Sequence, residues 1–505
     1  MLFNSFEFLL FLPIVFLFYW MVFKKNLKVQ NAFILLSSYV FYGWWDWRFL
    51  GLIIASSAVD YWSGMRLGHV IARTRNEDEA ISSKGTCISN KTASSFLLAV
   101  TSNPKFYLTL SLVFNLGLLG FFKYFNFFVE SATDFITLLG FQAHASTLNL
   151  ILPVGISFYT FQTMSYSIDV YRGKMEPTKD PVAFFAYVAF FPQLVAGPIE
   201  RASHLLPQFF IKREFEYQKS SDGMKLILWG LFKKMVIADN CALVVNPIFE
   251  NYQTASGLEL IMGAVLFSFQ IYGDFSGYSD IAIGTAKLFG FDLMTNFRTP
   301  YFSRNIAEFW RRWHISLSTW FRDYVYIPLG GSKVSKGKAI RNIFLVFLVS
   351  GFWHGANWTF IAWGGLHAAL FIPLFIFGKN RTYLSEGRHQ IPSFGEVFQI
   401  MLTFSLVTVA WVFFRSSTIS EAMDYLNGVF LQSFFPKSFA FFPYDLRGAL
   451  ILFLVLDWMG REEAAKPLKF IAYEKPFIRY TFYYSLIGLI FWMGGQENQF
   501  IYFQF

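Results

Sequence analysis

The chain has 505 residues, of which 55% are hydrophobic and only 15% are charged, whereas a soluble globular domain carries about 25% charged residues. Its net charge of +9 comes from 42 Lys and Arg against 33 Asp and Glu, and the basic residues lie in short loops between apolar segments. These features exclude a soluble protein and a nucleic-acid-binding module, and the two cysteines, Cys87 and Cys241, exclude a disulfide framework or a cysteine zinc site.

Apolar segments recur along the whole chain, and each has about 15–20 residues, close to the length that crosses a hydrocarbon core of about 30 Å. They predict an all-α polytopic integral membrane protein of about ten to twelve transmembrane helices, with interfacial and re-entrant helices among them. No internal repeat or Gly/Ser-rich linker divides them, so residues 1–505 are predicted to form a single domain. The predicted spans are 6–23, 31–44, 48–62, 106–129, 148–168, 182–199, 224–247, 258–273, 342–356, 358–377, 396–414, 447–458 and 478–494.

The first apolar segment is predicted to be a retained transmembrane helix rather than a signal peptide. Met1–Phe23 has no basic n-region and no cleavage site of small residues, and Glu7 lies near its start. Lys24, Lys25 and Lys28 follow it directly, so the positive-inside rule places the N-terminus outside.

Two acidic residues, Asp274 and Asp280, follow the apolar segment 258–273 and alternate with Ser276 and Tyr278. Ionisable residues at membrane depth face the interior of a helix bundle or a cavity. We therefore expect them to line a polar cavity, where they either bind substrate or hydrogen-bond across helices.

The segment Arg298–Arg341 interleaves basic and aromatic residues, and only two of its residues are acidic. This pattern predicts a helix that lies in the membrane interface. Arg311 and Arg312 suit phosphates, a pantetheine-type carrier or lipid headgroups. Lipid anchoring alone would account for the charges, but it does not account for His314 within the same run.

His354 lies inside an apolar segment, and an ionisable residue there marks a functional site by default. It lies 13 residues after Arg341, the expected cytosolic end of its helix. At ~1.5 Å per residue it is about 20 Å along the helix, past the midplane of a ~30 Å core. Lys379 and Arg381 follow the next apolar segment, so we expect a hairpin that returns to the cytosol, with His354 near its far turn.

The neighbours of His354 suit chemistry at this position. Gly351 and Gly355 leave room for a close backbone or a ligand. A neutral imidazole accepts the proton of a hydroxyl that attacks a thioester. The alternative is a histidine that only hydrogen-bonds between helices. His367, in the next apolar segment, is predicted to pack against neighbouring helices.

The C-terminal segment 499–505 follows Gly494 and Gly495 and is aromatic, with one phenol at Tyr502. Such a tail either inserts into a cavity and presents the Tyr502 hydroxyl as an acyl acceptor, or serves as an interfacial aromatic anchor.

Several long stretches of the sequence are similar to those of one family. The chain resembles the membrane-bound O-acyltransferase family, specifically its bacterial branch typified by the alginate O-acetyltransferase membrane subunit. This resemblance spans nearly the whole chain and implies helices that ring a central funnel, with the donor entering from the cytosol and the acceptor from outside. The stretches that carry it are Met1–Trp20, Ser38–Trp45, Pro153–Gln162, Phe191–Ile199, Asn305–Leu317, Asp323–Gly331 and Ser350–Trp358.

The resemblance also implies roles for residues, with the catalytic motifs in segment 298–380. It places a near-invariant histidine on His354, as general base or thioester-activating group, and a second polar position on His314, which would orient donor or acceptor. A C-terminal aromatic motif in related D-alanylation systems carries a tyrosine that receives the acyl group, which implies a third catalytic residue, Tyr502. The residues expected to bind substrate are Arg304, Asn305, Trp310, Arg311, Arg312, Asp323, Trp353 and Asn357.

The implied function is a membrane O-acyltransferase that moves an acyl group, expected to be acetyl, across the bilayer for O-acylation of a cell-envelope or exported polysaccharide. We expect acetyl-CoA or another acyl-CoA or acyl-carrier thioester as donor substrate, with no bound cofactor and no metal. The expected partner is an extracytoplasmic esterase-like acetyltransferase, and the expected location is the bacterial inner membrane, among its lipids.

Two alternatives stay open. The first is a non-catalytic transporter of an acylated carrier or polymer, with His354 lining the pathway. The second keeps the enzyme and changes the acceptor to peptidoglycan, teichoic acid, a lipid or a protein. The sequence does not distinguish among polymers such as alginate and cellulose.

Overall fold

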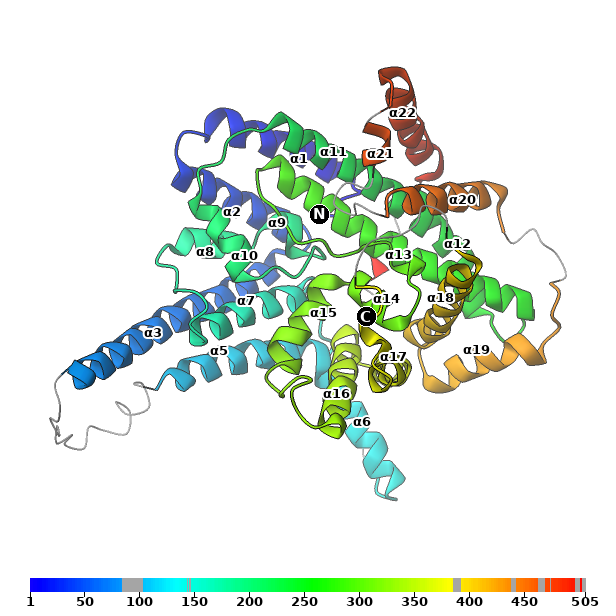
Figure 1. Ribbon diagram of the computed structural model, residues 1–505, viewed down its shortest axis with the longest axis horizontal. Coiled ribbons are helices and arrows are strands. Elements are labelled where there is room, and N and C mark those ends of the chain that lie inside the picture. Colours follow the sequence, from blue (N-terminus) through cyan, green and yellow to red (C-terminus); the bar gives the residue numbers. More distant parts are fainter. Residues whose placement is uncertain are drawn as a thin grey trace. The chain divides into compact units, whose positions relative to one another are not determined.

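The computed structural model describes residues 1–83, 103–142, 144, 147–384, 392–436, 442–461, 468–472, 474–495 and 500–501. Within these ranges the chain is helical and has no β-strand, which confirms the all-α prediction (Figure 1). Contacts divide the chain into two compact units. Unit 1 is Met1, Leu10–Val195 and Ile199–Phe215, and unit 2 is Leu2–Leu9, Ala196–Pro198 and Glu216–Phe505. That residues 1–505 form one domain stays a prediction.

Unit 1 is built on three long helices, α3 (Leu50–Ser83), α5 (Pro104–Leu119) and α7 (Ile156–Tyr171), which lie side by side in Figure 1. Buried polar contacts join them, because Asp60 of α3 accepts hydrogen bonds from Asn115 Nδ2 of α5 at 2.8 Å and from Ser111. Ser111 in turn bonds Ser167 of α7 at 2.9 Å. The helices of unit 1 are α2 (Leu27–Gly43), α3 (Leu50–Ser83), α5 (Pro104–Leu119), α6 (Phe125–Leu138), α7 (Ile156–Tyr171), α8 (Pro181–Val188), α9 (Phe191–Leu194) and α10 (Ala202–Leu205), and α1 (Phe6–Leu17) has residues in both units.

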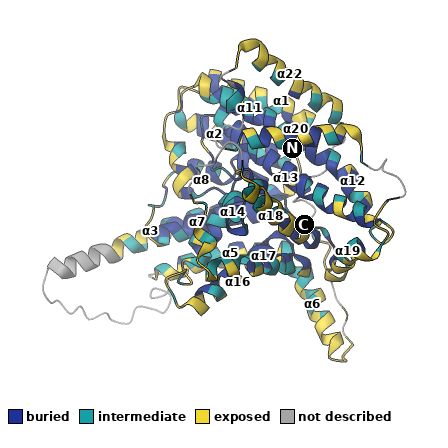
Figure 2. Cartoon of the chain, turned by 45° about the vertical axis from the view of Figure 1, so that its right-hand side comes forward, coloured by how far each residue is buried: buried dark blue, intermediate teal, exposed yellow. Residues whose placement is uncertain are grey.

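Unit 2 is organised around α13 (Gly257–Leu288), most of whose residues are buried (Figure 2). Its backbone touches that of α11 (Tyr217–Leu231), since a Cβ on Gly230 would lie 2.6 Å from the carbonyl oxygen of Gly277. Small residues allow such close helix crossings in membranes. The other helices of unit 2 are α12 (Asp239–Glu250), α14 (Ile306–Arg312), α15 (Ile315–Phe321), α16 (Lys336–His354), α17 (Trp358–Ile376), α18 (Phe394–Arg415), α19 (Ile419–Leu431), α20 (Tyr444–Met459), α21 (Lys469–Ala472) and α22 (Pro476–Met493).

Four helical segments of the described chain are long and apolar enough to cross a membrane: Pro104–Leu138, Gly257–Leu288, Trp358–Ile376 and Phe394–Arg415. They agree with a multi-pass membrane protein. The total of about ten to twelve crossings stays a prediction, because the other apolar helices are shorter.

Two predicted spans differ from the structure, and one helix was not predicted. The span 182–199 is not one helix, because α8 ends at Val188 and the four-residue α9 begins at Phe191. The span 148–168 is helical only from Ile156 onward. Helix α19 was not among the predicted spans; its N-terminus is capped by Thr418, whose side chain accepts the amide of Glu421 at 3.1 Å.

The prediction of one interfacial helix within Arg298–Arg341 is wrong. The chain forms two seven-residue helices, α14 and α15, which are separated at His314. The reason is long-range hydrogen bonding, because the amide of Ile315 donates to the carbonyl of Asn296 at 2.9 Å instead of continuing the helix. The Asn296 side chain also accepts the Ser316 hydroxyl at 2.9 Å, which fixes the start of α15.

Candidate active site

His354 is the last residue of α16, at the turn of the predicted hairpin with α17. Gly355 is extended, and α17 starts after Asn357, whose side chain accepts the amide of Thr359 at 3.0 Å. The same side chain donates to the carbonyl of Ser417 at 2.8 Å. The predicted hairpin with His354 at its turn is therefore confirmed, and Asn357 serves in it as a helix cap.

The two arms of the hairpin cross in direct backbone contact. A Cβ on Gly351 would lie 2.2 Å from the carbonyl oxygen of Phe360, and one on Gly364 would lie 2.3 Å from that of Phe347. A Cβ on Gly355 would enter the ring of Phe360 at 2.0 Å. The space left by Gly351 and Gly355 is thus filled by the partner helix rather than by a ligand, and this crossing fixes the backbone of His354.

The imidazole of His354 is buried, with 2% of the residue exposed. Its ring centroid lies 5.0 Å from that of Trp353, 5.2 Å from that of Trp363 and 5.5 Å from that of Phe414. The ring of His314 lies 6.2 Å away. The structure therefore brings together the two histidines that the sequence singled out.

His314 caps the start of α15 in a left-handed conformation, with φ 42° and ψ 55°. It is fully buried, and its ring packs 4.7 Å from Phe275 and 5.9 Å from Trp353. Among the described residues neither ring nitrogen of His314 has a hydrogen-bond partner. Burial lowers the pKa of His314 to about 3, so its imidazole is neutral at physiological pH.

The described end of the C-terminal tail reaches the same neighbourhood. Phe500 and Ile501 are buried, with 1% and 2% exposure. The Phe500 ring packs 6.0 Å from Phe275, the residue that also touches His314, and 4.8 Å from Tyr278. The tail therefore inserts into unit 2, which favours insertion over an interfacial anchor. Tyr502, predicted as the acyl acceptor, lies outside the described residues.

Asp274 and Asp280 of α13 lie in buried ion pairs. Asp280 pairs with Lys233 at 2.8 Å, and Asp274 pairs with Lys234 at 2.9 Å. Lys234 also pairs with Asp239 at 2.8 Å. The alternative that these acids bond between helices is confirmed. Sequence reasoning missed the two lysines, although consecutive ammonium groups inside an apolar segment signal such pairing.

A cavity of about 520 Å³ lies between the α14–α15 region and the α16–α17 hairpin. Its lining includes Trp310 and Ser350, and Ser350 lies one helical turn before His354. Arg322, Asn380 and Arg381 contribute polar groups to the same lining. The cavity therefore has a mostly apolar lining beside α16, the helix that carries His354, and it also has the guanidinium groups of Arg322 and Arg381.

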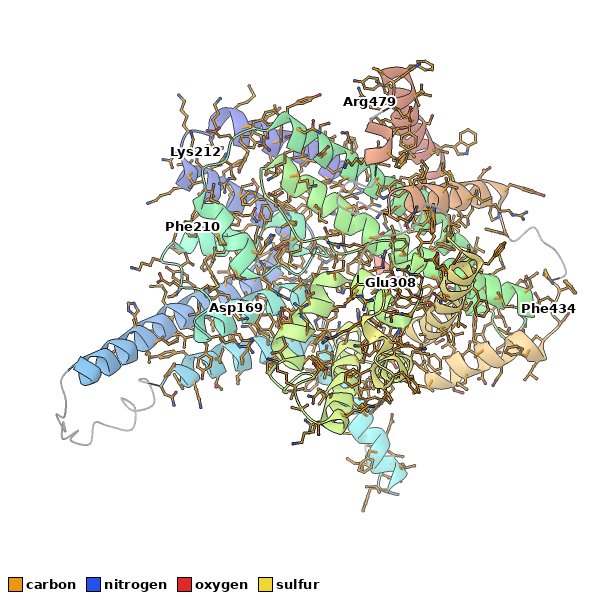
Figure 3. All side chains as sticks on the ribbon, in the orientation of Figure 1. Asp169, Phe210, Lys212, Glu308, Phe434 and Arg479 are labelled. Atoms are coloured by element: carbon orange, nitrogen blue, oxygen red, sulfur yellow. The ribbon has the colours of Figure 1, made fainter. Side chains whose placement is uncertain are left out.

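Three of the predicted substrate-binding residues contact Glu308, which is 1% exposed. Glu308 is labelled in Figure 3. Arg304 pairs with Glu308 at 3.1 Å and with Glu396 at 3.1 Å, and Arg312 pairs with Glu308 at 3.0 Å. Asn305 caps α14 by accepting the Glu308 amide at 2.8 Å. These contacts stabilise α14 and the residues just before it, because Glu308 bonds side chains at both ends of this helix.

Of the other predicted binding residues, some bond to other residues of the protein and one lines the cavity. Arg311 donates to the carbonyls of Asn380 and Thr382, each at 2.9 Å. Asp323 pairs with Arg322 at 2.7 Å. Trp310 lines the cavity, and the ring of Trp353 packs against those of both His314 and His354.

His367 packs as predicted. Its ring stacks on Phe309 with an interplanar angle of 3° and lies 4.9 Å from Trp310 and 4.8 Å from Trp363. His367 thus packs behind Trp310, which lines the cavity. Within the described ranges, His, Cys, Asp and Glu side chains form no group of three or more that could hold a metal ion.

Comparisons with known proteins show what the chain is similar to. A sequence model described as MBOAT, membrane-bound O-acyltransferase family, matches residues 177–410. The chain is 38% identical to probable alginate O-acetylase AlgI of Pseudomonas aeruginosa, over 85% of this chain and 75% of that protein. It is 35% identical to peptidoglycan O-acetyltransferase of Helicobacter pylori, over 85% of this chain and 80% of that protein. It is 30% identical to teichoic acid D-alanyltransferase of Bacillus subtilis, over 54% of this chain and 71% of that protein.

Proposed function

The chain belongs to the membrane-bound O-acyltransferase family, and from that premise we propose that it O-acetylates a cell-envelope or exported polysaccharide. It is a multi-pass membrane protein and an acyl-transferring enzyme. Similarity to relatives named for alginate and peptidoglycan O-acetylation supports a polymer acceptor. The observation that carries the proposal is the buried pair His314 and His354, whose rings lie 6.2 Å apart at the turn of a membrane hairpin.

In the proposed reaction His354 is the general base. One of its ring nitrogens takes the proton of an attacking hydroxyl while that oxygen bonds to the carbonyl carbon of a thioester. The tetrahedral intermediate expels the sulfur, which recovers the proton from His354, so the products are an ester and a free thiol. His314, neutral and buried beside it, orients the donor or the acceptor by a single hydrogen bond.

The proposed donor is acetyl-CoA, which would bind from the cytosol in the 520 Å³ cavity. Arg322 and Arg381 in its lining suit phosphate groups, because guanidinium forms bidentate hydrogen bonds to them. The apolar remainder of the cavity suits a pantetheine arm, with Ser350 one turn from His354 marking where the thioester would lie.

The proposed first acceptor is the hydroxyl of Tyr502. The burial of Phe500 and Ile501 beside Phe275, which touches His314, supports this role. From the tyrosyl ester the acetyl group would pass to an extracytoplasmic esterase-like partner at the bacterial inner membrane and then to the polymer. Deleting residues 500–505 should abolish polymer acetylation and preserve membrane insertion. Wild-type acetylation by the truncated chain would end the relay.

The test of the enzyme itself is a labelled-donor experiment. Purified protein incubated with acetyl-labelled acetyl-CoA should release CoA and give labelled acetate or a labelled acetyl group on the chain. A transporter of an acylated carrier or polymer would release no CoA. The proposed function would be contradicted if protein with a cooperative thermal unfolding transition released no CoA and gave neither labelled acetate nor a labelled chain.

A further inference from the structure

The described end of the C-terminal tail is hydrogen-bonded to a buried carboxylate of unit 2. The amide N–H of Ile501 donates to Oδ2 of Asp274 at 2.6 Å. Both residues are buried, with 2% exposure for Ile501 and 3% for Asp274. Because the donor is a main-chain group, this hydrogen bond depends on where the tail lies and not on which side chain residue 501 carries.

The carboxylate is itself held by a buried lysine. Lys234 is 4% exposed, and its ammonium lies 2.9 Å from Oδ1 of Asp274 and 2.8 Å from Asp239. A buried carboxylate stays ionised only when a cation and hydrogen-bond donors compensate its desolvation. The ion pair therefore offsets the desolvation of Asp274, whose one oxygen lies at Lys234 and whose other oxygen lies at the tail. Hydrogen bonds to a charged acceptor are about twice as strong as neutral ones.

The chain is also fixed just before the tail. Asn240 Nδ2 donates to the carbonyl of Met493 at 3.1 Å, at the last residue of α22. A Cβ on Gly494 would lie 2.8 Å from the side chain of Met235, so the chain leaves α22 in close contact with the π-helical segment Phe232–Ala238. That segment also carries Lys234. One short segment thus holds both the start of the tail and, through Asp274, its buried end.

Side-chain packing places this bond next to the histidine pair. Phe500 lies against Phe275 and Tyr278, which flank Asp274 on α13. Phe275 in turn packs 4.7 Å from His314. One aromatic ring, Phe275, therefore separates Phe500 from His314.

We infer that Asp274, fixed by Lys234, is a positioning residue that holds the C-terminal tail beside the histidine pair. The docking itself is independent of the chemistry, and its effect on acetyl transfer rests on the proposed function. The sequence did not single out Asp274 for this role, because its partner is a main-chain group 227 residues further along the chain.

The docking is tested by digestion of the purified full chain with a broad-specificity carboxypeptidase, read by intact mass. In the wild type, digestion should stop at the buried Ile501. In Asp274→Asn the loss of a charge-assisted hydrogen bond should speed removal of Ile501 and Phe500 by about tenfold or more. The matched control is Asp280→Asn, which removes a carboxylate of the same helix that pairs with Lys233 instead. Equal digestion of Asp274→Asn and Asp280→Asn would overturn the docking.

A second pair of variants covers the case in which Asp274→Asn does not fold. Ile501→Pro removes the donor N–H and leaves the ion pair untouched, whereas Ile501→Val keeps the donor. Acetylation of the polymer in cells should fall by about tenfold or more in Ile501→Pro and stay near wild type in Ile501→Val. Equal acetylation by the two variants would overturn the positioning role. If Asp274→Asn frees the tail and acetylation persists, the docking stands and the proposed role of the tail in transfer fails.

Discussion

At the scale of single residues, the site depends on two imidazoles that aromatic rings surround. Trp353 touches both rings, and Trp363 and Phe414 complete the wall around His354. Such a wall excludes water, which strengthens the electrostatic interactions of a transition state formed there. His354 and His314 are the titratable polar groups that this wall places closest together among the described residues.

His354→Ala should therefore remove the chemistry and preserve the fold. We expect CoA release from acetyl-CoA to fall by about 10²–10⁴-fold, the range of a lost general base. The matched control is His367→Phe, because His367 is also buried and, like His354, packs against Trp363. The role of His354 would be refuted by a comparable loss in both variants with unchanged thermal transitions.

Protonation of His314 should be visible in the pH dependence of the protein's stability. Its pKa is about 3 in the folded protein because of burial, against 6.5 for an ordinary histidine. The unfolded chain therefore binds more protons between these values, so the stability contributed by neutral His314 is present above about pH 6.5 and is lost as the pH falls toward 3. The melting temperature of the wild type should fall more steeply from pH 7 to 4.5 than that of His314→Asn, which tolerates the left-handed backbone. Parallel curves would contradict this assignment.

At the scale of elements, the α16–α17 hairpin is set by glycine contacts. The carbonyl of Phe347 occupies the position that a Cβ on Gly364 would need, at 2.3 Å, whereas a Cβ on Gly365 would meet only Leu348 at 3.8 Å. The two adjacent glycines thus differ in their environment although both belong to α17.

Gly364→Ala should separate the hairpin and displace His354. Overpacking at such a crossing costs about 1–3 kcal/mol or more, so we expect a lower melting temperature and a large loss of CoA release. Gly365→Ala should match the wild type in both measurements, because its methyl group meets ordinary van der Waals space. If the two alanine variants behave alike, close crossing is not what positions His354.

Much of the element pattern could be predicted from the sequence. Apolar runs such as 358–377 and 396–414 became the helices expected of them, α17 and α18. Asn357, expected to bind substrate, caps α17. The break at His314 could not be predicted, because it depends on hydrogen bonds to Asn296 that close only in the folded unit.

At the scale of the whole molecule, the charge pattern predicts how the hairpin is oriented in the membrane. Basic residues gather near the start of α16 and the end of α17, whereas the turn carries the buried His354. The positive-inside rule then places the former ends in the cytosol and the turn toward the outside. A donor from the cytosol and an acceptor from outside would meet from opposite directions.

This orientation is testable with two exposed serines. Ser335 precedes α16, and Ser417 accepts a hydrogen bond from Asn357 at the turn. In a chain with Cys87→Ser and Cys241→Ala, an impermeant maleimide should label Ser335→Cys only in inverted membrane vesicles and Ser417→Cys only in intact spheroplasts. If both cysteines were labelled from the same side, the start of α16 and the turn would not lie on opposite sides of the membrane, and the predicted orientation would be refuted.

The sequence by itself determined that the chain is helical and crosses membranes, because long apolar segments must satisfy every backbone group within a helix once they leave water. It also determined which histidine lies deep in such a segment, since depth follows from distance along one helix. Only the tertiary structure decided that His314 meets His354, that Arg304, Asn305 and Arg312 gather around Glu308, and that Asp274 takes the Ile501 amide. These contacts join residues of different elements, and their geometry depends on how helices pack, which no local pattern of residues specifies.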